Sequence, residues 1–340
     1  MSIRTQTGLM KAAVVPAKGA PWEIRNLPVP TPGPNQVLIK VKASAMSFTD
    51  VEQGRGDLPG PFPRVVGHEV VGQIIALGDA VTTRNIGDRV GVPYLQAGCG
   101  RCEWCLRGQR VLCREHLATS EQLQGGHAEY MTAFADAAML LPDKLSYSQA
   151  APLFGAGYTV WSGLRRANPL PAQTVAVLGI GGLGHLALQY AKAAGFNTVA
   201  ISRSPDKADF IREKLQADRV VANGEELAKA GGADVVLATG TSVVAMVDAI
   251  KGMRPDSTLV VMGYEGKPLP IPLGDLMMRR IKIIGSRANH PEHLYEALQL
   301  AASGKVAAIN ETYSLDEVNV AYARMIEGKV RYRAVLVFED

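Results

Sequence analysis

The stretch VAVLGIGGLGHLALQYAKAA, residues 175–194, decides the fold of this chain. Residues 175–178 are a short apolar run and residues 185–194 have a helical pattern, so the glycine-rich segment between them joins a strand to a helix. In such a GxGxxG loop the glycines allow a tight turn and close approach to a pyrophosphate, and the helix start favours the phosphate charge. The loop residues that we expect to contact a dinucleotide are Gly179, Gly181, Gly182, Leu183 and Gly184.

The sequence around this loop alternates between strands and helices. Further strands are predicted at 198–202, 219–222, 234–238, 258–262 and 281–285, and helices at 205–216, 225–230, 243–252 and 290–303. Such alternation indicates a doubly wound parallel sheet and therefore an α/β fold. The first 150 residues differ, because short apolar runs at 37–41, 70–75 and 88–92 stand between glycine and proline turns. They predict a β-rich, barrel-like domain.

Length and composition limit the remaining possibilities. The chain has 340 residues, of which 47% are hydrophobic and 20% charged, which favours two folded domains over disorder. A formal net charge of +4 is too small to indicate a nucleic acid or a membrane surface as a partner. Neither a signal-like apolar start nor a membrane-spanning run of about 18 residues is found. We expect a soluble, cytoplasmic protein that acts on a small molecule.

The residues after the second strand of the alternating region bear on the choice of cofactor. An acidic residue at this strand end would bind the ribose 2′-hydroxyl of NAD, but the chain reads ISRSPDK at 201–207. Ser204 and Pro205 are typical of a helix N-cap and first turn, which places Asp206 in that turn. A 2′-phosphate could be held by Ser202, Arg203, Ser204 and Lys207. The segment favours NADP(H) over NAD(H). The alternative is that Arg203 is a solvent-exposed loop residue without a ligand.

All four cysteines of the chain lie within fifteen residues of one another. They are Cys99, Cys102, Cys105 and Cys113, a C-x2-C-x2-C-x7-C pattern. In a reducing compartment such a cluster favours a metal over disulfides. Four thiolates complete a tetrahedral zinc shell and leave no open position, so we expect one structural Zn²⁺ per chain within a lobe at 95–116.

These features together resemble the zinc-containing medium-chain alcohol dehydrogenase family, the medium-chain dehydrogenase/reductases. Besides the glycine loop and the cysteine lobe, the resemblance includes GHE at 67–69, GDRV at 87–90, GHAEY at 126–130, APL at 151–153 and GKV at 304–306. It implies a GroES-like catalytic domain at 1–150, a Rossmann dinucleotide-binding domain at 151–288 and a return to the catalytic domain at 289–340. It also implies a homodimer or homotetramer, with 258–262 and 281–285 as candidate contact strands.

The chain departs from this family at the catalytic zinc. The family's zinc ligands are a cysteine, a histidine and a second cysteine, and the matching positions here are Ser47, His68 and Gly155. A serine hydroxyl is a poor zinc ligand beside thiolate or imidazole, and glycine offers no ligand. Thr49 matches the hydroxyl that relays the substrate proton in the family, and Glu69 follows His68 as usual. The candidate catalytic residues are therefore Ser47, Thr49, His68 and Glu69, while Asp50 is expected to be structural. The alternative roles are a hydrogen-bonded core histidine for His68 and a cap of nearby backbone for Thr49.

Without a catalytic zinc, charge must be stabilised by hydrogen bonds alone. Substrates that delocalise the negative charge, or whose double bond is already polarised, need less stabilisation, so the leading hypothesis is an NADPH-dependent reductase of an activated C=C, C=N or C=O bond. The alternatives are a conventional alcohol/aldehyde dehydrogenase and a nucleotide-binding protein without turnover. Aromatic pocket candidates are Phe48, Tyr94, Phe154 and Trp161, each of which would also suit core packing.

Overall fold

The computed structural model describes residues 8–339, and the chain divides into two compact units. The first unit comprises residues 1–155 and 308–340, and the second comprises residues 156–307. This division differs from the predicted boundaries, since residues 289–307 belong to the second unit. There helix α10 (Pro291–Ala302) packs on its neighbours, for example through Tyr190 Oη, which donates to Ala297 O at 3.1 Å. The first seven residues of the predicted 1–150 domain lie outside the described part of the chain.

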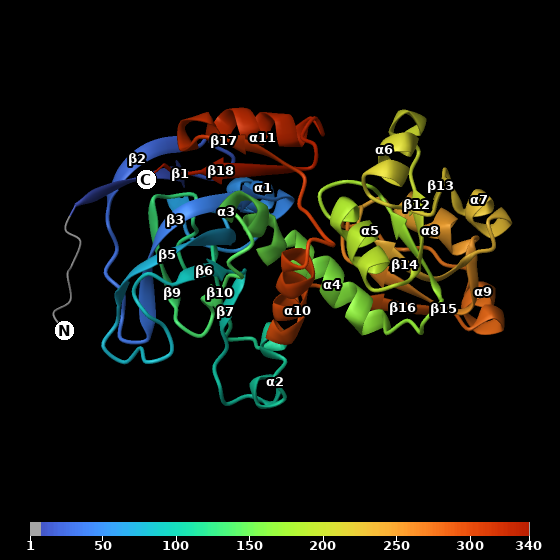
Figure 1. The fold of residues 1–340 in the computed structure, drawn as a ribbon, viewed down its shortest axis with the longest axis horizontal. Helices are drawn as coiled ribbons and strands as arrows, with labels where there is room; N and C mark the ends of the chain where they lie inside the picture. The colour runs from blue at the N-terminus through green and yellow to red at the C-terminus, as the bar shows by residue number, and fades with distance from the viewer. Residues whose placement is uncertain (1–7, 340) are drawn as a thin grey trace. The chain divides into compact units, whose positions relative to one another are not determined.

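The second unit is a parallel six-stranded sheet with helices on both faces, in the order β13-β12-β11-β14-β15-β16 (Figure 1). Its strands are β11 (Thr174–Leu178), β12 (Asn197–Ile201), β13 (Arg219–Val221), β14 (Ala233–Ala238), β15 (Met253–Val261) and β16 (Lys282–Gly285). Its other helices are α4 (Ala156–Ala167), α5 (Gly184–Ala193), α6 (Ala208–Glu213), α7 (Gly224–Lys229), α8 (Val243–Ile250) and α9 (Leu273–Arg279), with a 3-10 turn at Pro205–Lys207. The predicted doubly wound sheet is confirmed.

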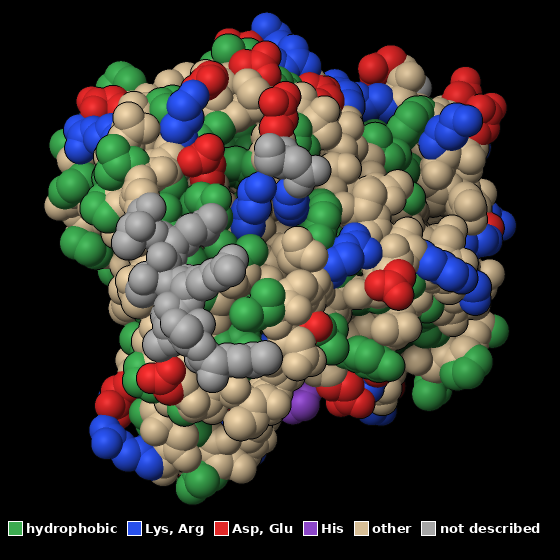
Figure 2. Space-filling model, turned by 60° about the vertical axis from the view of Figure 1, so that its left-hand side comes forward, with side chains coloured by type: hydrophobic (Ala, Val, Ile, Leu, Met, Phe, Trp, Pro, Cys, Tyr) green, Lys and Arg blue, Asp and Glu red, His purple; other side chains and the backbone are tan. Residues whose placement is uncertain are grey.

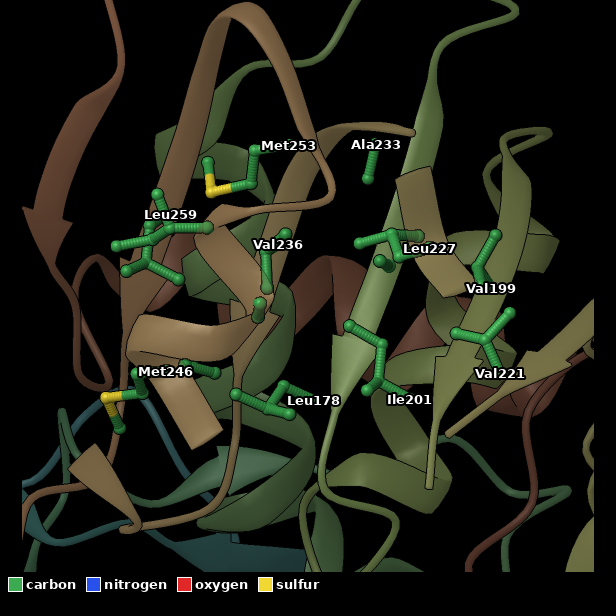
Figure 3. Close-up of a cluster of buried hydrophobic side chains, with 14 of the residues drawn as sticks. Leu178, Val199, Ile201, Val221, Leu227, Ala233, Val236, Met246, Met253 and Leu259 are labelled. Atoms are coloured by element: carbon green, nitrogen blue, oxygen red, sulfur yellow. The ribbon is translucent and has the colours of Figure 1, made fainter. Parts of the chain in front are cut away.

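The two faces of this sheet follow from the alternation of side chains along each strand. In β14, Val236 and Ala238 join the buried cluster shown in Figure 3, together with Leu227 of α7 and Met246 of α8. Val235 and Leu237 alternate with them and are also buried, which is why the strand has no polar face. The predicted helix at 205–216 is shorter in the structure, because α6 ends at Glu213 and Gln216 has a φ of 58°.

The first unit is built on a seven-stranded sheet in the order β10-β6-β5-β3-β18-β17, with β9 also paired to β3. Besides this sheet, the unit has a three-stranded sheet, β2-β1-β4, and a two-stranded sheet, β7-β8. The strands of the whole unit are β1 (Leu9–Val15), β2 (Glu23–Pro28), β3 (Gln36–Met46), β4 (Arg64–Val65), β5 (Glu69–Leu77), β6 (Arg89–Val92), β7 (Leu95–Ala97), β8 (Leu117–Ala118), β9 (Tyr130–Phe134), β10 (Met139–Leu140), β17 (Asn310–Tyr313) and β18 (Arg333–Val337). Its helices are α1 (Phe48–Arg55), α2 (Glu103–Leu106), α3 (Tyr147–Ala150) and α11 (Val318–Ile326), with 3-10 turns at Arg110–Leu112, Ala151–Phe154 and Leu315–Glu317.

The C-terminal strand returns to this unit, as the sequence predicts. Strand β18 pairs antiparallel with β3, with Ala334 opposite Met46, and α11 packs on the same apolar cluster (Figure 1). This pairing brings Arg333 to the end of β3, where α1 begins.

One of the predicted pocket residues lies in the interior. Phe154 is a core residue, because it is fully buried and a Cβ on Gly91 would lie 2.1 Å from its ring.

On the face of the molecule drawn in Figure 2, basic and acidic side chains are interspersed. Across residues 8–339, no helix combines the length and the apolar character needed to cross a membrane.

Candidate active site

Ser47 holds the start of helix α1. Its Oγ accepts a hydrogen bond from Thr49 N at 3.1 Å, and its own N–H donates to Asp50 Oδ2 at 2.7 Å. These reciprocal bonds form a capping box, which satisfies two amide groups that the helix start would otherwise leave free. The Ser47 oxygen is thus used by the helix. Thr49 lies half-buried in the first turn, and its hydroxyl has no hydrogen-bond partner among residues 8–339.

Asp50 orients His68. The carboxylate is fully buried, accepts from Gly67 N at 3.0 Å and lies 3.2 Å from His68 Nδ1. Burial raises the pKa of Asp50, but the charge and hydrogen bond of His68 outweigh it and bring the pKa to about 2. Burial likewise lowers the pKa of His68, yet the Asp50 charge and hydrogen bond give a net increase. Since Nδ1 is held by Asp50, Nε2 is the ring nitrogen left for another partner.

Glu69 forms a buried ion pair with Arg333. The side chains are 2% and 5% exposed, and Arg333 Nη2 donates to Glu69 Oε2. Burial raises the pKa of Glu69 above its usual value, although the charge of Arg333 opposes this effect. No local sequence pattern marks Arg333 as a partner of Glu69, because 264 residues separate the two positions.

The Glu69 carboxylate also occupies the space next to Gly155. A Cβ on Gly155 would lie 2.1 Å from Glu69 Oε1 and 2.5 Å from its Cδ, far inside contact distance. Thus where the family has a thiolate, this chain places a carboxylate that is already paired with Arg333. Within residues 8–339, the sole group of three or more His, Cys, Asp or Glu side chains arranged to share a metal ion is the cysteine cluster.

The four cysteines do converge. Their sulfur atoms all lie within 4.8 Å of one another, and none forms a disulfide. A tetrahedral zinc with Zn–S bonds of about 2.3 Å needs sulfurs about 3.8 Å apart, so this donor set fits the ion. Backbone amides support the sulfurs, since Cys99 N lies 3.4 Å from Cys113 Sγ and Cys102 N lies 3.4 Å from Cys99 Sγ. The cluster is separate from the group around His68.

The glycine loop leaves the carboxyl end of β11, between strands β12 and β14, where the strand order reverses. Gly179 has a φ of 88°, a conformation that suits glycine. Its carbonyl accepts from Thr239 Oγ1 at 2.6 Å. Gly184 packs directly on this turn, because a Cβ there would lie 2.0 Å from Gly179 O. This close strand–helix contact is the third role assigned to such glycines.

Two glycine substitutions separate packing from cofactor binding. Gly184→Ala is expected to lower the Tm of the cofactor-free protein, because its Cβ would clash with the carbonyl oxygen of Gly179, a backbone atom that can shift only by distorting the turn. Gly181→Ala is the matched control, since a Cβ there meets nothing within 4 Å. We expect it to keep the Tm and to weaken dinucleotide binding by removing close access to the pyrophosphate. Thermal scans with and without NADPH measure both effects; equal Tm losses in the two variants would contradict this assignment.

The turn proposed for the 2′-phosphate has a different hydrogen-bond pattern from the predicted cap. Ser204 N donates to Ser202 Oγ at 3.3 Å, and Lys207 N donates to Ser204 O at 3.2 Å, within a 3-10 turn. Arg203 is exposed at this turn, as is Asp206. Exposed donors suit either a 2′-phosphate or solvent, so the choice of NADP(H) stays a prediction.

Two neighbours of the Asp50–His68 pair are Tyr94, a pocket candidate from the sequence, and His127. The ring of Tyr94 meets the ring of His68 edge-on, with centroids 5.6 Å apart, and its hydroxyl donates to Glu121 Oε1. His127 is fully buried with Nδ1 2.8 Å from Ser44 Oγ, and burial lowers its pKa to about 4. His127 is therefore neutral at pH 7, and His68 is the histidine whose pKa Asp50 raises. Only the fold brings these residues together, since they come from separate strands and loops.

Comparisons with known proteins agree with this architecture. Residues 33–143 match the family model of the alcohol dehydrogenase GroES-like domain, and residues 182–303 match that of the zinc-binding dehydrogenases. An alcohol dehydrogenase of Geobacillus stearothermophilus is 39% identical over 335 residues, covering 96% of this chain and 99% of that protein. One of Rhizobium meliloti (strain 1021) is 40% identical, covering 96% and 98%. The structure of a cinnamyl alcohol dehydrogenase from Sorghum bicolor has a TM-score of 0.89 at 28% identity, covering 97% and 98%.

Proposed function

The chain belongs to the zinc-containing medium-chain alcohol dehydrogenase family and is an NAD(P)-dependent oxidoreductase, and we propose that it reduces activated double bonds with NADPH and without a catalytic metal. The observation that carries this proposal is the pairing of Glu69 with Arg333 in the space beside Gly155. Ser47, which stands at the first ligand position, caps α1 with its oxygen. Neither position then offers a thiolate, and His68 alone does not make a zinc site.

The proposed reaction is hydride transfer from the nicotinamide to a carbon of a C=C, C=N or C=O bond. Where negative charge develops on the substrate, His68 is suited to supply the proton, because Asp50 orients it and favours its imidazolium form. Thr49 is the second candidate donor, since its hydroxyl has no other partner within residues 8–339. Among neutral substrates, conjugated carbonyl compounds fit best, because delocalisation reduces the charge that the protein must stabilise.

The conventional alternative has its own support. The curated relatives at about 40% identity are alcohol dehydrogenases, and their similarity extends over nearly the whole chain. Reversible oxidation of a simple alcohol is thus the second candidate. It would require the polarising role of zinc to be taken by hydrogen bonds to the alkoxide, which is the harder task for a metal-free site.

Metal analysis combined with a substrate panel tests the proposal. We expect one zinc per chain, bound by the four cysteines, and NADPH oxidation with enones or imines in preference to matched simple aldehydes. NADH is tested alongside, with a lower kcat/KM expected because Ser202 and Arg203 offer donors rather than an acid. Two zinc ions per chain, or turnover confined to simple aldehydes and alcohols, would refute the metal-free mechanism.

A homo-oligomer is part of the same proposal. Strand β16 is the open edge of the six-stranded sheet, and exposed edges invite pairing with another chain. The adjacent helix α9 leaves Leu273, Met277 and Met278 between 72% and 78% exposed. A homodimer or homotetramer would cover both features, and light scattering of the purified protein would show it.

A further inference from the structure

Glu121 is a carboxylate close to the proposed reaction centre that the mechanism above does not use. Its side chain is 8% exposed, and Oε1 accepts from the hydroxyl of Tyr94. Tyr94 in turn touches the His68 ring edge-on, with ring centroids 5.6 Å apart. One tyrosine ring therefore separates this carboxylate from the histidine that we assign to the substrate.

No strong cation neutralises Glu121 among residues 8–339. Its one ion-pair contact there is with His116 Nε2 at 4.0 Å, the outer limit of such a contact. Glu121 also interacts electrostatically with Arg64, but the Arg64 guanidinium donates its hydrogen bonds to the carbonyl oxygens of Pro59 and Gln53. A mostly buried carboxylate without a close cation is costly unless another partner completes it.

We propose that Glu121 and Tyr94 form a recognition site for a positively charged nitrogen, and that the substrate of this enzyme is an iminium ion or protonated imine. The inference rests on the proposed reductase function and narrows its substrate class. The Glu121 carboxylate supplies the counter-charge, and the neighbouring Tyr94 ring supplies a π face to which cations are attracted. Neutral enones and aldehydes would bring no counter-charge to the carboxylate, whose neutral hydrogen-bond donors are the Tyr94 hydroxyl and, at 3.4 Å, Gln122 Nε2.

The chemistry of an iminium ion suits a site without a metal. A dihydronicotinamide cofactor would supply the hydride that bonds to the iminium carbon, so that the C=N π electrons become the nitrogen lone pair. The cofactor would be oxidised to NADP⁺, and the product would be a neutral amine that takes up a proton from solvent afterwards. No oxyanion develops, so neither a Lewis acid nor a proton donor is needed during the transfer.

The carboxylate should act on binding more than on the hydride step. The substrate loses its positive charge during the transfer, so Glu121 stabilises the bound substrate at least as well as the transition state. An interaction of this kind lowers KM without raising kcat. Loss of Glu121 should then raise KM for a cationic substrate and change kcat much less, which a merely structural residue would not do.

The first test uses binding, so that it does not depend on turnover. Calorimetry on the full chain saturated with NADP⁺ compares tetrahydroisoquinoline, protonated at neutral pH, with its neutral isostere isochroman. We expect tetrahydroisoquinoline to bind at least about tenfold more tightly, and Glu121→Gln to abolish that preference while isochroman binding is retained. Glu115→Gln is the matched control, because this acid, six residues before Glu121, is 60% exposed. Equal affinities in the wild type, or equal losses for both ligands in Glu121→Gln, would overturn the proposal.

The second test uses turnover of the N-methyl-3,4-dihydroisoquinolinium ion against 2-cyclohexenone. Glu121→Gln should raise KM for the iminium ion about tenfold and leave the constants for the enone within twofold. A retained preference for tetrahydroisoquinoline with no NADPH oxidation by any activated substrate would support the cation site and refute the reductase function. Turnover of enones with no preference for cations would do the reverse.

Discussion

Replacing Cys102 with serine is expected to remove the zinc from the protein and to lower its Tm by roughly 5–10 °C. A structural zinc contributes its binding free energy to folding, so its loss costs several kcal/mol, and in a domain of this size each kcal/mol shifts the Tm by about 2–4 °C. Apart from the cysteines, few buried side chains stabilise the lobe at 95–116. Helix α2 has four residues, none of them buried, and Leu106 at its end is 75% exposed.

The measurement is a thermal scan with metal analysis of the same preparation. Glu115→Gln again serves as the control, since its bond to Arg101 at 2.7 Å is a surface ion pair worth little. A strong chelator should reproduce the effect of Cys102→Ser in the wild type and have little effect on the variant. A variant that still holds one zinc per chain at an unchanged Tm would show that the four sulfurs do not bind the ion together.

Replacing His68 with glutamine is expected to lower kcat for an enone at pH 7 by about 10²-fold, the lower end of what a general acid contributes. The wild type should lose activity as pH rises through the pKa of His68, because only the imidazolium can donate the proton. That pKa lies above the usual histidine value, since Asp50 outweighs the effect of burial. The pH–rate profile of His68→Gln should lack this alkaline decline.

Two variants identify the source of the effect. Asp50→Asn removes the negative charge that raises the pKa of His68, so the alkaline decline should move to lower pH. Thr49→Val tests the other donor; if it alone removes the decline while His68→Gln keeps it, the proton comes from the hydroxyl. An iminium substrate needs no proton in the transfer, so His68→Gln should reduce its turnover far less. This difference links the proton donor to the substrate class proposed above.

The sequence was sufficient wherever a short segment carries its own signal. The GxGxxG loop after β11 and the alternation of strands with helices predicted the parallel sheet, because these patterns reflect local backbone geometry and side-chain periodicity. The cysteine spacing predicted the cluster for the same reason, and its sulfurs do lie within 4.8 Å of one another. The boundary near residue 288 was less accurate, since the side chains of α10 pack on helices more than a hundred residues away.

The sequence by itself also determined that two thiolates are missing from the family's catalytic zinc site. Only the tertiary structure decided what stands in their place. A helix cap uses Ser47, a carboxylate paired with Arg333 fills the space at Gly155, and a second carboxylate lies beyond Tyr94. These arrangements join positions 264 and 27 residues apart, as in Glu69 with Arg333 and Tyr94 with Glu121. Charge pairing inside a protein depends on distance in space, which sequence spacing does not encode.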